Sequence, residues 1–154
     1  MEKDTRTPKE NAELRKEGNT PHSGKKTILL VEDDHLLGDL LLQKLRESGL
    51  SVLHAGDAQT ALIKIREEKP DLILLDLVLP GMSGFDILRE VKENPETANI
   101  VVIILSNLGQ KEDLERATAL GADDFLIKAN FTPSEIAAKV QKIFQENNLR
   151  QSEL

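Results

Sequence analysis

A short apolar run that meets a single carboxylate constrains the fold more than any other stretch. Residues Leu72–Leu75 are all apolar, and they lead directly into Asp76. A half-exposed strand would alternate apolar and polar side chains, so this run predicts a strand buried on both faces. Pro80 and Gly81 end the extended run, and apolar residues resume at helical spacing after Gly84. Asp76 is therefore expected where a core strand opens into a loop.

The rest of the chain repeats this alternation of strand-like and helix-like segments. Further apolar runs that predict strands occupy residues 27–31, 51–55, 100–105 and 125–128. A helical pattern follows each run, and residues 132–135 form a capping box that opens the last helix. Because helices supply the crossovers that parallel strands require, the pattern predicts an α/β fold. We expect a five-stranded parallel sheet with five helices on its two faces.

Acidic residues mark where the first two helices begin. Asp34 and Asp57 each precede an amphipathic segment, where a short acidic side chain can cap free N–H groups. In the first of these helices an apolar stripe is expected to face the core, formed by Leu36, Leu37, Leu40, Leu41 and Leu45.

Length and composition limit the class of protein. A chain of 154 residues with 39% apolar and 31% charged residues suits one globular domain. It has no cysteine, which excludes disulfides and thiolate chemistry, and no apolar run approaches the roughly 18 residues of a membrane helix. A net charge of −7 argues against general, non-specific binding of nucleic acid. These features predict a cytoplasmic protein that binds neither membrane nor nucleic acid directly.

The composition divides the chain into three parts. Residues 1–24 are charged and rich in helix breakers, which predicts a disordered N-terminal tail. Residues 25–146 carry the alternating pattern of the domain, and residues 147–154 form a polar C-terminal tail. Neither flank has the length of an effector domain, so output is expected through contact with other proteins.

The predicted topology brings together reactive side chains that are far apart in the sequence. Carboxyl ends of parallel strands share one edge of a sheet, and the residues expected there are Glu32, Asp33, Asp76, Ser106 and Lys128. Three neighbouring carboxylates resist ionisation unless a cation lies among them, and oxygen-only ligands favour Mg²⁺. The Ser106 hydroxyl and the Lys128 ammonium suit a second anionic group. The set therefore predicts a phosphoryl group carried by Asp76.

Four motifs, in this order and spacing, give the chain a specific resemblance. They stand at residues 28–34 (ILLVEDD), 75–84 (LDLVLPGMSG), 105–106 (LS) and 121–128 (GADDFLIK). The sequence resembles the receiver domain of a bacterial two-component response regulator, of the single-domain chemotaxis-regulator type, over about residues 25–145. This resemblance implies a flavodoxin-like doubly wound sheet with strand order 2-1-3-4-5.

The resemblance also implies roles for particular residues. Asp76 would accept the phosphoryl group, from a sensor histidine kinase or a phosphotransfer protein. Glu32 and Asp33 would hold Mg²⁺ together with Asp76 and the backbone carbonyl of Val78. Such a protein is not an enzyme in the ordinary sense, since it catalyses only its own magnesium-dependent phosphorylation and dephosphorylation.

The remaining implied roles concern the phosphoryl group and the output. Ser106 and Lys128 would contact the phosphoryl oxygens, and Phe125 would be the aromatic residue that changes rotamer on activation. A downstream protein would bind the face formed by the fourth helix, the fifth strand and the fifth helix. The chain would be a monomer or a phosphorylation-dependent dimer.

One departure from the family pattern leaves an alternative open. The family usually has proline after the lysine, whereas Lys128 is followed by Ala129, so a different loop path must aim the ammonium. A receiver that no longer accepts phosphate and acts only as a docking module is the alternative that this departure supports. A phosphatase of the haloacid dehalogenase type would need a second Asp where Val78 stands, and a flavodoxin-like binder would need a Ser/Gly-rich loop after the first strand. His35 and His54 are expected to be surface or strand residues rather than metal ligands.

Overall fold

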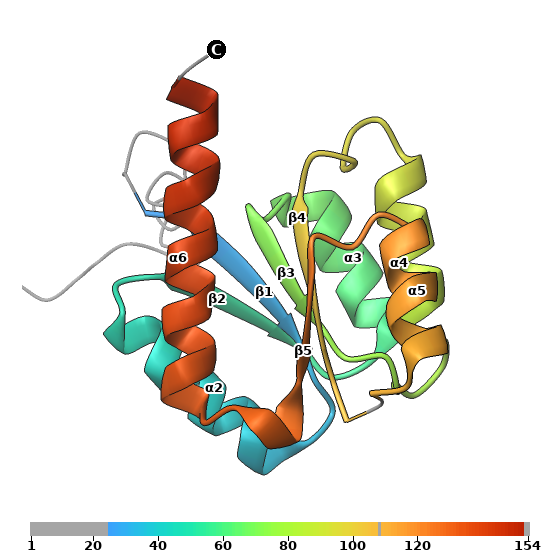
Figure 1. The fold of residues 1–154 in the computed structure, drawn as a ribbon, viewed down its shortest axis with the longest axis horizontal. Coiled ribbons are helices and arrows are strands. Elements are labelled where there is room, and N and C mark those ends of the chain that lie inside the picture. Colours follow the sequence, from blue (N-terminus) through green and yellow to red (C-terminus); the bar gives the residue numbers. More distant parts are fainter. Residues whose placement is uncertain (1–24, 108, 153–154) are drawn as a thin grey trace, which may run out of the picture.

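The computed structural model describes residues 25–107 and 109–152, and for residues 147–152 it describes the backbone alone. The predicted N-terminal tail lies outside the described residues. Five parallel strands form one sheet in the order β2-β1-β3-β4-β5 (Figure 1). The strands are β1 Thr27–Val31, β2 Ser51–Ala55, β3 Leu72–Leu75, β4 Val101–Ser106 and β5 Asp124–Ile127. Both the predicted parallel sheet and its strand order are confirmed.

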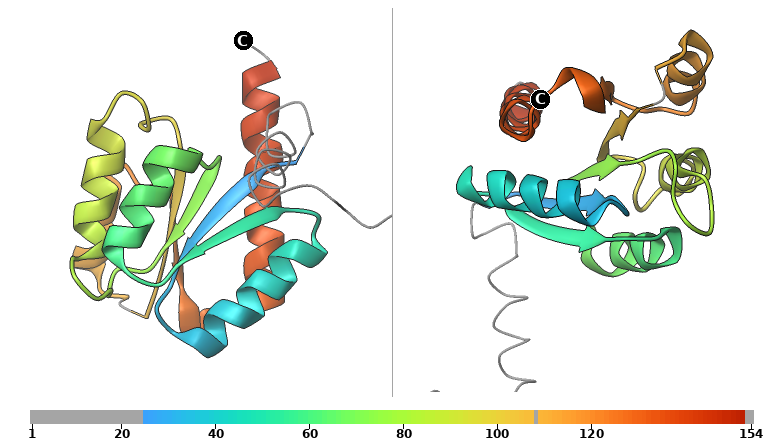
Figure 2. Two further views of the ribbon diagram at one scale, coloured as in Figure 1. Left: turned by 180° about the vertical axis from the view of Figure 1, so that it is seen from behind. Right: turned by 90° about the horizontal axis from the view of Figure 1, so that it is seen from below.

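Helices cover both faces of this sheet, as Figure 2 shows from two further directions. The helices are α2 His35–Glu47, α3 Ala58–Glu68, α4 Gly84–Glu93, α5 Lys111–Ala119 and α6 Pro133–Ser152, with a 3₁₀ turn η2 at Lys128–Asn130. Helices α2 and α6 pack on one face, and α3, α4 and α5 pack on the other. Among these helices, none combines the length and the apolar character needed to cross a membrane.

The alternation of side chains along the central strands builds two cores. Leu29 and Ile73 face the helices α3, α4 and α5, whereas Leu30 and Leu74 face α2 and α6. All four side chains are completely buried. This explains why β1 and β3 are continuous apolar runs, since a strand with two covered faces has no position left for a polar side chain.

Side-chain caps fix where the helices begin. The Asp34 carboxylate accepts the N–H of Leu37 at 3.1 Å, and Asp57 accepts the N–H of Thr60 at 2.8 Å. At the start of α6, Thr132 and Glu135 each accept the backbone N–H of the other. The predicted caps and the predicted capping box are therefore present.

The predicted apolar stripe of α2 is only partly correct. Leu41 and Leu45 are fully buried, but 73% of Leu36 and 40% of Leu40 is exposed. The residue that faces the sheet near the start of α2 is Gly38, which is buried. The positions three and seven residues after Gly38 are Leu41 and Leu45, so the buried side of α2 is a narrow strip, and Leu36 and Leu40 lie outside it.

Helix α6 continues to Ser152, past residue 146, where the sequence pattern placed the end of the domain. No glycine or proline occurs between residues 145 and 152, so nothing in the sequence interrupts the backbone hydrogen bonds of the helix.

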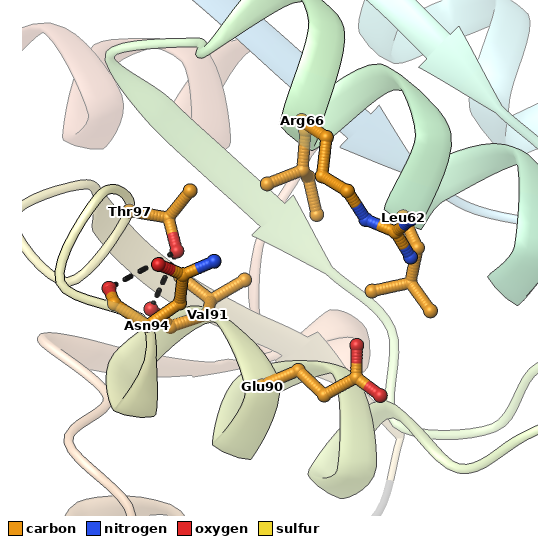
Figure 3. Close-up of a pocket in the computed structure, with 7 residues that line it drawn as sticks. Leu62, Arg66, Glu90, Val91, Asn94 and Thr97 are labelled. Atoms are coloured by element: carbon orange, nitrogen blue, oxygen red, sulfur yellow. Dashed lines mark hydrogen bonds between the residues drawn. The ribbon is translucent and has the colours of Figure 1, made fainter.

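A small hollow lies between α3 and α4 (Figure 3). Its walls are formed by Leu62, Ile65, Arg66, Glu90, Val91, Asn94 and Thr97. The buried Thr97 hydroxyl donates to the carbonyl of Val91 at 2.7 Å. The hollow is small, with a volume of about 30 Å³. The helical residues that line the hollow belong to the C-terminal halves of α3 and α4. Both helices run antiparallel to the strands, so the hollow lies away from the sheet edge that carries Asp76.

Candidate functional site

Asp76 follows β3 and extends its ladder by one residue, since its N–H donates to the carbonyl of Val31 at 3.1 Å. Only 6% of the residue is exposed. Its Oδ1 accepts the backbone N–H of Val78 at 3.0 Å, and its Oδ2 lies 2.8 Å from the Lys128 ammonium. The carboxylate is thus held in one orientation by a loop amide on one oxygen and a cation on the other.

Glu32 is the most deeply buried acid of the cluster, with 1% of the residue exposed. Its Oε2 accepts the N–H of Asp34 at 3.1 Å. Its Oε1 forms an ion pair with the Lys128 ammonium at 2.6 Å. Asp33 is exposed, and carboxylate oxygens of Glu32, Asp33 and Asp76 lie within 4.8 Å of one another. The structure therefore brings together the three acids that the topology predicted.

Lys128 reaches both buried acids without a proline after it. It is the first residue of the 3₁₀ turn η2, which follows β5 directly, and the described peptide bonds are all trans. Its ammonium contacts Glu32 and Asp76 at 2.6 and 2.8 Å, and only 13% of its side chain is exposed. The tight turn after β5 thus aims the lysine where the sequence pattern had left its direction open.

The charges of the cluster are mutually dependent. Burial raises the pKa of Glu32, the charge of Asp76 raises it further, and the Lys128 ammonium acts in the opposite direction. Burial acts to lower the pKa of Lys128, but its contacts with Asp76 and Glu32 outweigh burial, so the net shift is upward. Two buried carboxylates share one ammonium, which leaves the cluster with an excess of negative charge.

The raised pKa of the buried Glu32 predicts a pH dependence of stability in the metal-free protein. The folded chain binds a proton at Glu32 more tightly than the unfolded chain does, because the folded-state pKa lies above the usual 4.5. The stabilisation that results from proton binding at Glu32 is fully present below pH 4.5 and is lost as the pH rises through the folded-state pKa of Glu32. Its slope approaches at most about 1.4 kcal/mol of unfolding free energy per pH unit.

Replacing Glu32 with Gln should remove the part of the pH dependence of unfolding free energy that comes from this carboxyl group. Urea unfolding in EDTA, followed by far-ultraviolet circular dichroism from pH 4.5 upward, measures the slope for the wild type and Glu32→Gln. Glu47→Gln is the matched control, since 54% of the Glu47 side chain is exposed. If the unfolding free energies of the wild type and of Glu32→Gln changed equally with pH, Glu32 would not titrate as described.

Of the other predicted residues, Ser106 and Val78 lie at the same edge of the sheet, whereas Phe125 lies within β5. Ser106 ends β4, next to β3, and is completely buried. Phe125 lies on β5 opposite Ile104 and is partly buried against the core on the α3, α4 and α5 side. Val78 is 60% exposed, and its backbone N–H is bound to Asp76.

Two features of the site escaped the sequence analysis. The ring of His54 lies 2.8 Å from the backbone carbonyl of Glu32, a contact that no spacing rule indicates. Gly84 packs against the backbone of Asp76 and Leu77, and its N–H donates to the Leu77 carbonyl at 2.9 Å. The glycine was visible in the sequence as a turn residue, but its close approach to Asp76 was not.

The donor set suits a hard divalent cation. It consists of carboxylate oxygens alone, and the three acids carry more negative charge than the Lys128 ammonium offsets. Such a cation would relieve the repulsion among Glu32, Asp33 and Asp76. These residues therefore fit a magnesium-type ion.

Comparison with known proteins places the chain in a family. Residues 28–141 match the response regulator receiver domain. The chain belongs to this family. The resemblance noted in the sequence is thereby confirmed, and with it the role in phosphorylation-activated two-component signalling that the family performs. Receiver domains are signalling domains that interact with kinases and with downstream targets.

Three similar proteins illustrate the relationship. The phosphate regulon transcriptional regulatory protein PhoB of Pseudomonas aeruginosa is 34% identical over 128 residues, covering 83% of this chain and 56% of PhoB. A CheY-like receiver domain from Methanospirillum hungatei is 27% identical with a TM-score of 0.75, covering 82% of this chain and 98% of that one. The Mn²⁺-bound form of response regulator Rcp1 is 30% identical with a TM-score of 0.67, covering 77% and 91%.

These relatives change one expectation. The chain spans about half the length of the curated relatives it matches, and PhoB is a transcriptional regulator. The exclusion of nucleic acid, which rested on net charge, is therefore not supported.

Proposed function

We propose that this chain is a receiver switched by phosphorylation of Asp76, which takes the phosphoryl group from a histidine kinase or a phosphotransfer protein and signals through protein contacts. The observation that carries the proposal is the placement of the Asp76 carboxylate beside the Lys128 ammonium, 2.8 Å away, and beside two further carboxylates. Mass spectrometry of the chain after exposure to a small acyl phosphate tests it directly.

Phosphoryl transfer is a displacement at phosphorus. An oxygen of Asp76 forms a bond to phosphorus, while the bond from phosphorus to the donor breaks and its electron pair leaves with the donor. In an acyl phosphate the leaving atom is a carboxylate oxygen, and in a phosphohistidine it is a ring nitrogen. Lys128 already contacts Asp76 Oδ2, so its ammonium lies where it can offset the charge of the incoming phosphoryl oxygens.

We further propose Mg²⁺ as the cofactor, held by the carboxylates of Glu32, Asp33 and Asp76 and by the backbone carbonyl of Val78. Bound there, the ion would lower the charge repulsion between the acids and the phosphoryl group. The fit rests on the all-oxygen donor set and on its excess negative charge. The Mn²⁺-bound state of Rcp1 is consistent with a divalent cation in a related chain.

On this proposal the chain catalyses only reactions at its own Asp76. It takes phosphate from a small donor or a kinase and loses it again by hydrolysis. The alternative of a docking module that accepts no phosphate rested on the missing proline after Lys128. The contacts of the Lys128 ammonium with Glu32 and Asp76 favour the receiver that accepts phosphate.

The output is proposed to pass from Asp76 through Ser106 to Phe125. Ser106 is buried at the end of β4, so a movement of its hydroxyl toward new phosphoryl oxygens frees space beneath α5. Phe125 is partly buried on the neighbouring strand and can turn into that space. A downstream protein, or a second copy of the chain, would bind the face formed by α5, β5 and α6.

Beryllofluoride, which mimics a phosphoryl group on a carboxylate, allows this path to be tested by NMR. In the presence of Mg²⁺ we expect amide shifts at residues 32–34 and also around Phe125 and along α5. Phenylalanine has no hydroxyl to bury, so the free chain should already sample the inward rotamer. Shifts confined to the acidic loop, with Phe125 unchanged, would contradict this switch.

A further inference from the structure

The ring of His54 occupies a position that ties it to the acidic site. His54 lies on β2, one residue before the strand ends, and its Nε2 is 2.8 Å from the backbone carbonyl of Glu32. A carbonyl oxygen can only accept a hydrogen bond, so Nε2 carries the proton and donates it. The N–H of Glu32 in turn donates to the carbonyl of Ala55 at 3.0 Å. Both backbone polar groups of Glu32 are thus held by β2.

The ring of His54 also faces α2. A Cβ atom at Gly38 would lie 3.5 Å from His54 Nε2, so the ring lies against the backbone of α2. Gly38 also donates its N–H to the carbonyl of Asp34 at 2.8 Å, which is a hydrogen bond of the first helical turn. The ring therefore bonds to Glu32 and faces Gly38, and these two residues lie on either side of the exposed Asp33 in the sequence.

The held carbonyl belongs to a rigid unit. A peptide group is planar, so the Glu32 carbonyl lies in one plane with the backbone nitrogen and Cα of Asp33. Fixing that carbonyl limits rotation of the peptide and hence the direction in which both acidic side chains leave the backbone. The N–H of Glu32 belongs to the preceding peptide group, so its bond to the Ala55 carbonyl does not by itself fix the peptide between Glu32 and Asp33.

We propose that His54 is a positioning residue for cation binding: its ring N–H fixes the peptide between Glu32 and Asp33 and so presets both carboxylates for Mg²⁺. This rests on the proposed function, in which these acids hold the ion. His54 does not itself coordinate through Nε2, because that nitrogen is engaged by the Glu32 carbonyl. Groups that orient ligands in this way commonly change metal affinity about tenfold to a hundredfold when removed.

Calorimetric titration with MgCl₂ tests the proposal, and it suits a chain that lacks the tryptophan and tyrosine needed for a fluorescence readout. In His54→Gln the side-chain amide can occupy the position of Nε2, whereas in His54→Asn it is too short to reach the carbonyl. We expect about tenfold weaker Mg²⁺ binding for His54→Asn and His54→Leu, and binding within about threefold of wild type for His54→Gln. His35→Leu, at an exposed histidine, is the matched control and should bind Mg²⁺ as the wild type does.

The variants separate this inference from the proposed function. If wild type binds no Mg²⁺, the proposed cofactor fails. If wild type binds but His54→Asn binds equally well, or His54→Gln binds as weakly as His54→Asn, the positioning role is overturned. Urea unfolding of each variant in EDTA detects a general loss of fold, and the comparison of the two polar variants remains decisive should His54→Leu be unstable.

Discussion

Asp76→Asn is expected to reduce phosphorylation of the chain by a small acyl phosphate to below detection. The amide has nearly the shape of the carboxylate, and its oxygen can still accept the N–H of Val78, which donates to Oδ1 at 3.0 Å. Lys128 keeps its contact with Glu32 at 2.6 Å. The fold is therefore retained, while the nucleophilic carboxylate is lost.

Intact-mass and peptide mass spectrometry measures the result, with and without EDTA. Phosphorylation of the wild type should require Mg²⁺, because the charge of three neighbouring carboxylates opposes the approach of an anionic donor. Asp33→Ala should weaken Mg²⁺ binding with little loss of stability, since Asp33 is exposed. Asp86→Asn is the control, because Asp86 forms only a surface ion pair with Arg89. A phosphorylated Asp76→Asn chain, or equal phosphorylation in EDTA, would contradict the assignment of Asp76.

The sequence was sufficient to predict the sheet because burial leaves a direct signature in its strands. The ends of β1 and β3 agree with the apolar runs to the residue, because both faces of these strands are covered. The predicted ends of β2 are also correct, although three of its five residues are only half-buried. The carboxyl-edge grouping of Glu32, Asp33 and Asp76 followed from topology alone, because parallel strands must end on the same side.

The details that the sequence did not predict depend on packing between distant segments. The aim of Lys128 is set by a single 3₁₀ turn, and a turn of three residues has no periodic pattern. Leu36 and Leu40 fit a helical stripe, but their exposure is decided by how far α2 is rotated against the sheet. His54 bonds to a backbone carbonyl 22 positions away, and a carbonyl has no residue-type signal.

Gly84 illustrates a constraint that is spatial rather than conformational. A Cβ atom at this position would lie 2.7 Å from the Cα of Leu77 and 3.0 Å from the carbonyl carbon of Asp76, and still closer to the Asp76 carbonyl oxygen. These are backbone atoms, which cannot turn aside as the end of a flexible side chain can. The backbone of Gly84 does not have the positive φ that itself favours glycine, so the lack of space is the whole constraint.

Gly84→Ala should therefore damage both the fold and the site. We expect a loss of about 1 to 3 kcal/mol in unfolding free energy, because the added methyl group must push α4 away from the end of β3. The same push displaces the backbone of Asp76, and a misplacement of about 1 Å in a reacting group can cost about a hundredfold in rate. Urea unfolding and the rate of phosphorylation by an acyl phosphate measure the two effects.

Gly56→Ala is the matched control for this prediction. A Cβ atom there meets nothing within 4 Å, and the backbone has no positive φ. Alanine at this position should leave phosphorylation unchanged and the unfolding free energy within about 0.5 kcal/mol of the wild type. If Gly84→Ala behaved like Gly56→Ala, the contact of α4 with the backbone of Asp76 would not control the position of the phosphorylation site.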